Sequence, residues 1–181
     1  MWLAWHKFGG VTIGLELGSL SYLTGSLSFN PIFNQTLTIH FICTGNIYRS
    51  RLAEAYCASS GGPGLHVYSS GIGTSLNRDV SISPYAARVL EERGLERFAS
   101  PSWQQTTAAL VRASDVLVFM EREHYCFCQD WIDPKRQTVE IWDIQDVGQA
   151  DASGIVNQVK RTFEMIRQRT DVLLAALGVK G

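Results

Sequence analysis

The sequence lacks an excess of charge of either sign. Its 16 lysines and arginines nearly balance 17 aspartates and glutamates, which gives a net charge of -1 at pH 7. A broadly basic surface of the kind that binds nucleic acid is therefore excluded, and so is an acidic solvating tail. If the protein binds an anion, the site has to be a local arrangement of residues rather than a property of the whole surface.

Cysteine is also scarce, with four residues at irregular spacing: Cys43, Cys57, Cys126 and Cys128. This number and spacing do not match a disulfide-stabilised secreted scaffold. Cys126 and Cys128 flank a single residue, and no second Cys pair or Cys/His cluster accompanies them, so we expect no zinc or other metal site. We therefore predict reduced thiols, a cytoplasmic location and no cofactor.

Long unbroken apolar runs are missing as well. The first 36 residues are rich in glycine, serine, leucine and aromatics, but Lys7 is their only basic residue and Glu16 interrupts the apolar stretch. Neither a signal peptide nor a membrane-spanning helix fits this pattern, so we expect no integral membrane span. We interpret residues 1–36 as a poorly ordered N-terminal extension and residues 37–181 as one domain. The alternative is that the extension binds a membrane surface or a partner.

From residue 37 onward, strand patterns alternate with helix patterns. Strands are expected at residues 37–43, 65–71, 115–120 and 138–144, and helices at residues 50–60, 83–94, 106–114 and 156–177. This alternation predicts an α/β fold, a three-layer α/β/α sandwich with a central four-stranded parallel sheet. In such folds ligands bind at the carboxyl ends of the strands. That edge would bring Cys43, which ends the first strand, close to Asp143 and Asp146, which follow the fourth.

The loop after the first strand, CTGNIYRS at residues 43–50, has the residue types of an anion site. Backbone N–H groups between a strand and a helix can point inward at an anion, helped by the helix dipole. Gly45 and Asn46 tolerate the left-handed conformations that a tight loop needs. Arg49 can form two parallel hydrogen bonds with a phosphoryl group. The same donors would stabilise Cys43 as a thiolate nucleophile, with Ser50 donating to its sulfur.

A cysteine followed six residues later by an arginine is common by chance, and a buried cysteine beside a helix-capping loop is the alternative. Here the flanking strand, the Gly-Asn pair, the serine after the arginine and the helix make the combination specific. FICTGNIYRSRLAEA, residues 41–55, resembles the signature V-C-x-G-N-x-C-R-S-P-x-A-E of the low molecular weight protein tyrosine phosphatases. The resemblance continues through YSSG, VLEERG, ASDVLVFM and WDIQDVGQ, and it extends over residues 37 to about 177.

The resemblance implies a protein tyrosine phosphatase that works through a phosphocysteine intermediate. Cys43 would be the nucleophile, Arg49 the phosphate-binding residue, and Asp146 the general acid. Asp143, the other carboxylate at this edge, would have a structural role. Phosphate binding and loop support would come from Thr44, Gly45, Asn46, Ile47, Tyr48 and Ser50. The implied partner is a phosphotyrosine-containing protein or peptide, and inorganic phosphate or other oxyanions would act as inhibitors.

Several residues depart from the family pattern. Tyr48 replaces a second loop cysteine, which removes the reversible protective disulfide that many members form. Arg51 replaces a proline and would add a cation beside the phosphate site. Val147 replaces the proline after the general acid, so we expect a looser acid loop. The family's loop-buttressing histidine has no counterpart, and we expect Ser100 or Ser102 to substitute for it.

The loop also bears on the substrate. Ile47 stands where phosphoarginine phosphatases of this family carry threonine, and its apolar side chain favours the phenyl ring of phosphotyrosine. Tyr85, at the start of a nearby helix, is expected to pack rather than bind. An arsenate reductase of the same fold would need two further cysteines after the third strand, and Met120 stands at the first of these positions. A third interpretation, favoured by Val147, is a phosphoprotein- or oxyanion-binding module with weak or no turnover.

Overall fold

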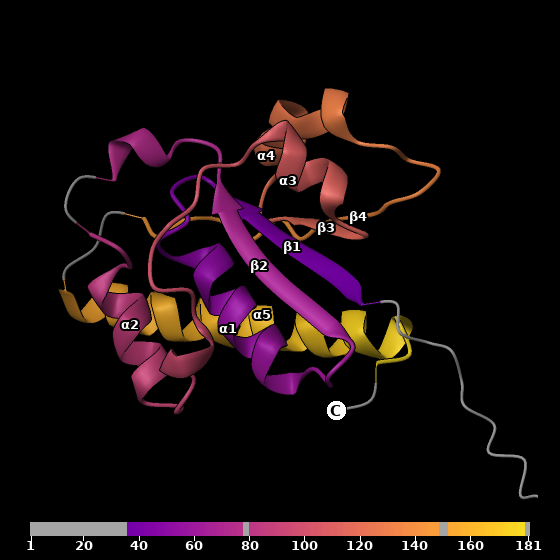
Figure 1. Cartoon of the computed structure of the whole chain (residues 1–181). Coiled ribbons are helices and arrows are strands. Elements are labelled where there is room, and N and C mark those ends of the chain that lie inside the picture. The colour runs from indigo at the N-terminus through magenta and orange to yellow at the C-terminus, as the bar shows by residue number, and fades with distance from the viewer. Residues whose placement is uncertain (1–35, 78–79, 149–151, 180–181) are drawn as a thin grey trace, which may run out of the picture. The chain divides into compact units, whose positions relative to one another are not determined.

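The structure, a computed structural model of the 181-residue chain, describes residues 36–77, 80–148 and 152–179 (Figure 1). The N-terminal extension expected at residues 1–36 lies outside the described residues except for Thr36, so it stays a prediction. Within the described ranges, none of the helices combines the length and the apolar character that crossing a membrane requires.

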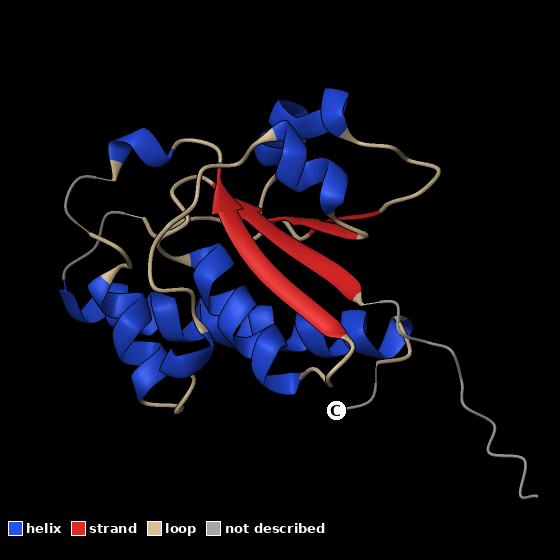
Figure 2. Ribbon diagram, in the orientation of Figure 1, coloured by secondary structure: helices blue, strands red, loops and turns tan. Residues whose placement is uncertain are grey.

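Four strands form one fully parallel sheet, as the alternation of strand and helix patterns predicts (Figure 2). They are β1 (Leu37–Cys43), β2 (Leu65–Gly71), β3 (Val116–Phe119) and β4 (Thr138–Ile141). Their spatial order is β2-β1-β3-β4. β1 is therefore central, and the chain passes from β2 on one side of it to β3 on the other. The register pairs Cys43 with Gly71 of β2, and Ile42 with Phe119 of β3.

Helices cover both faces of the sheet, which confirms the predicted three-layer α/β/α sandwich (Figure 1). One face carries α1 (Arg49–Ser60), α2 (Pro84–Glu91) and α5 (Ala152–Ala176). The other face carries α3 (Ala108–Ala113) and α4 (Arg122–Cys128). Short 3-10 turns lie between them at η1 (Thr74–Leu76), η2 (Glu96–Phe98) and η3 (Gln129–Trp131).

The side chains of β1 divide the core into two layers, because successive residues of a strand point to opposite faces. Ile39, Phe41 and Cys43 belong to the larger cluster, which includes residues of α1, α2 and α5. Ile42 belongs to the smaller cluster, which includes Cys128 of α4. The side chain of Cys43 therefore lies on the α1 face of the sheet, at the end of its central strand.

The seven-residue helix α4 is the element that the sequence patterns did not predict. Its residues show no apolar periodicity. Its start depends on a reciprocal cap, in which the Glu121 carboxylate accepts from the N–H of His124 and the His124 ring accepts from the N–H of Glu121. The usual capping box has serine or threonine first and glutamate or glutamine fourth, so this pair gives no recognisable start signal.

Candidate active site

The CTGNIYRS loop lies at the carboxyl end of the central strand, the position predicted for a phosphate-binding loop. β1 ends at Cys43, and α1 begins at Arg49. Gly71, at the end of β2, lies directly against the loop: a Cβ atom there would come within 2.6 Å of the carbonyl oxygen of Thr44. Because no side chain fits at Gly71, the glycine allows the loop to close against the sheet.

The backbone carbonyls of the loop point outward. Four of them accept hydrogen bonds from neighbouring segments: Cys43 from Ile72, Thr44 from Gly73, Gly45 from the Asn77 side chain, and Ile47 from Ser83. The described chain has no cis peptide, and in a trans peptide the next residue's N–H points opposite to the carbonyl. The N–H groups that follow these carbonyls therefore point into the loop, as Asn46 shows by donating to Cys43 Sγ at 3.2 Å. This is a cradle of backbone donors for an anion.

The Cys43 sulfur lies in this cradle and is almost completely buried, with 3% of the residue exposed. It lies 3.0 Å from Ser50 Oγ and 3.2 Å from the backbone nitrogen of Asn46. A hydroxyl at the start of a helix and an N–H of the loop are partners that stabilise a thiolate. The arrangement suits a nucleophile held beneath a bound oxyanion.

Asn46 holds the loop in shape through its side chain. Its backbone φ is 55°, in the left-handed region. Its Nδ2 donates to Ser50 Oγ at 2.9 Å and to Ser69 Oγ at 2.7 Å, and its Oδ1 accepts from Gln104 N at 2.8 Å. Ser69 in turn donates to the buried Glu54 carboxylate at 2.6 Å. The loop is thus tied to β2 and to α1 through one buried network.

Arg51 does not line the pocket, although it lies close enough to Cys43 for their charges to interact, so the cation expected beside the phosphate site acts from behind the loop. It is 1% exposed and donates to the carbonyl oxygens of Ser100 and Ser102. Its Nε lies 3.5 Å from Oε2 of Glu54, and Ser100 donates its hydroxyl to the same carboxylate. Burial lowers the pKa of Arg51, while Glu54 opposes this shift. Together, Arg51 and Ser100 buttress the network that supports Asn46.

Arg49 is buried at the start of α1, and Nη1 of its guanidinium group is held by two protein acceptors. Nη1 donates to Glu121 Oε2 at 2.5 Å and to the Ile144 carbonyl at 2.8 Å. Nη2 donates to Asp146 Oδ2 at 2.9 Å and to Thr44 Oγ1 at 3.3 Å. Nε is buried without a hydrogen-bond acceptor among the described residues. The edge formed by Nε and Nη2 is therefore the one that can grip two oxygens of an anion.

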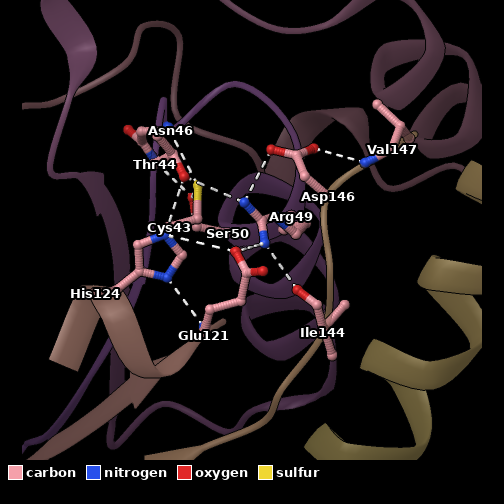
Figure 3. A network of polar contacts seen from close by, with 10 residues as sticks. All are labelled: Cys43, Thr44, Asn46, Arg49, Ser50, Glu121, His124, Ile144, Asp146 and Val147. Atoms are coloured by element: carbon pink, nitrogen blue, oxygen red, sulfur yellow. Dashed lines mark hydrogen bonds and ion pairs between the residues drawn. The ribbon is translucent and has the colours of Figure 1, made fainter. Parts of the chain in front are cut away.

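Asp146, rather than Asp143, is the carboxylate that the structure brings to the cradle (Figure 3). Its Oδ2 accepts from Arg49, and its Oδ1 accepts from the N–H of Val147 at 2.8 Å. Proline has no N–H and could not make this hydrogen bond, which restrains the carboxylate itself. The expectation of a looser acid loop stays a prediction. Asp143 is exposed, has a φ of 52°, and is not among the residues that line the pocket beside Cys43.

His124 is a site residue that the sequence analysis missed. It lies on α4, is buried, and its Nε2 is 3.0 Å from Thr44 Oγ1 (Figure 3). Burial, reinforced by the Arg49 cation, lowers the pKa of His124 to about 4, so the ring is neutral at pH 7. The signal that would have found it is its place four residues beyond Met120, because the carboxyl end of β3 lies at the same edge as that of β1.

A pocket of about 240 Å³ opens beside Cys43. The loop forms its polar side, and its apolar side is formed by Ile47, Tyr48, Tyr85, Val147, Ile155 and Val159. Tyr85 packs against the core, as the sequence suggested, and it also lines the pocket. Burial raises the pKa of Tyr48 to about 12, so its phenol is neutral. Pockets for drug-sized ligands have volumes of about 300 to 1,000 Å³, so this smaller pocket suits a single ring.

The other cysteines are not arranged around Cys43. All four thiols are free. Cys57 and Cys128 are buried, which raises the pKa of each to about 12, and Cys126 is exposed on α4. Cys128 packs in the core cluster on the opposite face of the sheet from Cys43. Among the described residues, no group of three or more His, Cys, Asp and Glu side chains is placed to hold a metal ion.

Comparisons with known proteins agree on the family and the fold. A sequence model described as low molecular weight phosphotyrosine protein phosphatase matches residues 38–180. Arsenate reductase 1 of Staphylococcus epidermidis is 30% identical over 138 residues, which cover 75% of this chain and 98% of that protein. The low molecular weight phosphotyrosine phosphatase of Vibrio cholerae O395 has a similar structure, with a TM-score of 0.63 at 18% identity over 78% of this chain and 97% of that one. The YwlE arginine phosphatase of Geobacillus stearothermophilus also has a similar structure, with a TM-score of 0.59 at 20% identity over 77% of this chain and 94% of that one.

Proposed function

Since the chain belongs to the low molecular weight phosphotyrosine protein phosphatase family, we propose that it hydrolyses phosphotyrosine through a phosphocysteine intermediate. One observation carries the proposal: the buried Cys43 sulfur lies in a cradle of inward-facing N–H groups beside Nε of Arg49, which has no acceptor in the part of the chain that the structure describes. A thiolate, an anion cradle and a bidentate cation are the groups that phosphoryl transfer to sulfur needs. The proposed reaction uses no cofactor.

In the first step, the Cys43 thiolate attacks the phosphorus atom of phosphotyrosine. An S–P bond forms while the P–O bond to the phenol breaks, and the loop N–H groups and the Nε–Nη2 edge of Arg49 bind the non-bridging oxygens. The phosphoryl group displaces Asp146 from Nη2 of Arg49. Once it has left Arg49, Asp146 takes up a proton from the solvent and gives it to the leaving phenolate oxygen, which needs it because the pKa of a phenol is about 10.

In the second step, water attacks the phosphorus atom of the phosphocysteine. The Asp146 carboxylate accepts a proton from the water, the S–P bond breaks, and Cys43 leaves as a thiolate. Ser50 Oγ, 3.0 Å from the sulfur, stabilises that leaving group. The products are inorganic phosphate and the enzyme with Asp146 protonated again, and Asp146 returns that proton to the solvent, so the cycle closes.

We propose phosphotyrosine rather than phosphoarginine as the substrate because of the pocket's apolar side. Ile47, Tyr48 and Tyr85 offer apolar and aromatic surface to a flat ring. The guanidinium group of phosphoarginine is polar on all its edges, and it would lose hydration against this surface without gaining hydrogen bonds. A phenyl ring has no edge hydrogen bonds with water to lose on this surface.

Arsenate reduction is a second candidate, favoured by the 30% identity to an arsenate reductase. Its chemistry requires a second thiol that reaches the oxidised Cys43. Met120 stands where the family resemblance implies the first extra cysteine, Cys128 is buried on the opposite face of the sheet, and Cys126 is exposed on α4. This placement supports phosphatase chemistry over reductase chemistry.

The free cysteines also support a proposal about location and boundaries. Four unpaired thiols are typical of a reducing compartment, so we propose that the protein acts on phosphotyrosine proteins in the cytoplasm. We further propose that residues 37–181 form the phosphatase domain and that residues 1–36 extend from it.

The test is turnover of p-nitrophenyl phosphate and of a phosphotyrosine peptide by the full chain. Cys43→Ser is compared with Cys126→Ser, which changes an exposed cysteine outside the pocket in the same way. We expect Cys43→Ser to abolish turnover and Cys126→Ser to leave it unchanged. Mass spectrometry of the acid-quenched wild-type reaction should find a phosphoryl group on the peptide that contains Cys43.

Other outcomes would select the alternatives. Phosphopeptide binding without turnover would identify a binding module. Turnover confined to phosphoarginine would overturn the argument from Ile47, Tyr48 and Tyr85. Arsenate-dependent oxidation of Cys43 together with Cys126 or Cys128 would favour the reductase.

A further inference from the structure

The Thr44 side chain lies between the loop, Arg49 and α4, and the reaction as described so far does not use its hydroxyl. We propose that this hydroxyl donates a hydrogen bond to a non-bridging oxygen of the bound phosphoryl group, and that His124 is the positioning residue that fixes its direction. The inference rests on the phosphate site of the proposed function and adds a side-chain donor to it.

The direction of the hydrogen bonds at His124 follows from one donor whose proton has a fixed place. The backbone N–H of Glu121 points at Nδ1 at 3.0 Å, so Nδ1 is the acceptor. A neutral imidazole with an accepting Nδ1 carries its proton on Nε2. The low pKa of the buried ring keeps it neutral. Nε2 is therefore the donor in its 3.0 Å contact with Thr44 Oγ1.

Thr44 consequently receives two hydrogen bonds and has one to give. Its second donor is Arg49 Nη2, at 3.3 Å. A hydroxyl has two accepting lone pairs and one O–H, so both lone pairs are used and the O–H must point away from His124 and Arg49. Among the described residues, these two are the hydrogen-bond partners of Thr44 Oγ1.

The remaining O–H is available to the phosphate site. Thr44 is exposed and lines the pocket together with Cys43 and Asp146. Figure 3 shows Thr44 and Asp146 converging on Arg49, where both contact Nη2. A phosphoryl oxygen that replaces Asp146 on Nη2 comes within reach of the Thr44 hydroxyl. A hydrogen bond to an anionic oxygen is about twice as strong as one between neutral groups.

The first comparison removes the hydroxyl alone. Thr44→Val keeps the shape of the side chain without the O–H, and Thr44→Ser keeps the O–H. We expect Thr44→Val to lower the affinity for inorganic phosphate and kcat/KM for a phosphotyrosine peptide by about 10- to 100-fold. Thr44→Ser should recover most of both. Isothermal titration calorimetry gives the phosphate affinity of the full chain, thermal melting verifies folding, and Cys126→Ser serves as the control on α4.

Two variants of His124 separate its effect on Thr44 from its capping of α4. His124→Gln places an N–H donor near the position of Nε2, whereas His124→Asn places an acceptor near the position of Nδ1. We expect His124→Asn to match Thr44→Val and to add no further loss in the double variant. His124→Gln should keep most of the phosphate affinity. A purely structural role in capping predicts the reverse order, with asparagine the better replacement.

The outcomes distinguish this inference from the proposed function. Equal phosphate affinity of Thr44→Val and wild type would overturn the inference, and so would retained affinity in His124→Asn with a loss in His124→Gln. Phosphate binding is measured without turnover, so the comparison holds even for an inactive chain. A wild type that binds phosphate without hydrolysing phosphotyrosine would count against the proposed function alone.

Discussion

Arg49 is balanced by two carboxylates before any substrate arrives, and the two are held differently. Glu121 contacts Nη1, which the Ile144 carbonyl also binds, and it caps α4. Asp146 contacts Nη2, is half-exposed, and among the described residues its other hydrogen bond is from its neighbour's N–H. A phosphoryl group therefore displaces Asp146 rather than Glu121. The displaced carboxyl group remains at the pocket, where the leaving oxygen of the substrate will be.

This displacement leads to a prediction about Asp146. Asp146→Asn removes the acid but keeps the size of the side chain, so we expect kcat for a phosphotyrosine peptide to fall by about 10²- to 10⁴-fold. The loss should be smaller for p-nitrophenyl phosphate, because the nitro group stabilises the leaving phenolate and reduces its need for a proton. Steady-state kinetics on both substrates measures the ratio of the two losses in kcat.

Asp143→Asn is the matched control, since Asp143 does not line the pocket beside Cys43. Equal losses on the two substrates would mean that Asp146 binds rather than donates a proton. A larger loss in Asp143→Asn than in Asp146→Asn would transfer the role of acid to Asp143.

Among the secondary structure elements, the strands and the loop could be predicted because their signals are local. β1 and β3 are buried on both faces and therefore read as apolar runs. Cys43 and Arg49 lie within one loop, so their spacing in the sequence is enough to predict the phosphate site. Arg51 could not be placed in this way. Its partners at Ser100 and Ser102 lie 49 and 51 positions away, and an arginine on a helix looks the same in sequence whether it is exposed or buried.

The burial of Arg51, a residue of α1, against the segment after η2 leads to a stability prediction. Arg51→Met would leave Glu54, which is 3% exposed, without its cation, and would leave two carbonyls without their donor. Breaking a buried ion pair from one side costs about 3 to 5 kcal/mol, so we expect a loss of that order in the free energy of unfolding. Urea unfolding followed by tryptophan fluorescence measures it.

Arg88→Met provides the control at an exposed pair. Arg88 of α2 and Glu92, which follows the end of that helix, lie 3.1 Å apart, and an exposed pair of this kind contributes at most about 1 kcal/mol. The double variant Arg51→Met/Glu54→Gln should recover part of the stability, because it removes the uncompensated charge. Equal small losses in Arg51→Met and Arg88→Met would show that Arg51 is solvated in solution.

Across the whole molecule, two buried histidines join the layers of the fold in their neutral form. His40 of β1 contacts Ser70 of β2 at 2.6 Å and Ser114, after α3, at 3.3 Å. His124 joins α4 to the phosphate loop at Thr44. Burial lowers the pKa of His40 to about 3, and burial with the Arg49 cation lowers that of His124 to about 4. The helix layer formed by α3 and α4 is thus attached to the sheet and the loop by two uncharged rings.

The low pKa values of these rings predict how stability depends on pH. As the pH is lowered below about 6.5, the unfolded chain takes up protons at these histidines before the folded chain does. The free energy of unfolding should therefore decrease as the pH is lowered, by up to about 1.4 kcal/mol per pH unit for each ring. Hydrogen bonds from Lys160 and from Arg167 lower the pKa values of Glu92 and Glu164 respectively, so those groups titrate at lower pH.

Urea unfolding between about pH 7 and pH 5 therefore isolates the two histidines from the carboxylates. His40→Gln should remove about half of the slope, because it leaves one buried ring to titrate. His66→Gln, at an exposed position of β2, should leave the slope unchanged. A flat profile would mean that both rings are protonated or solvated in solution. An Nε2–H donor that orients Thr44 through a neutral His124 would then be untenable, so the pH profile of the whole molecule also tests the geometry of the site.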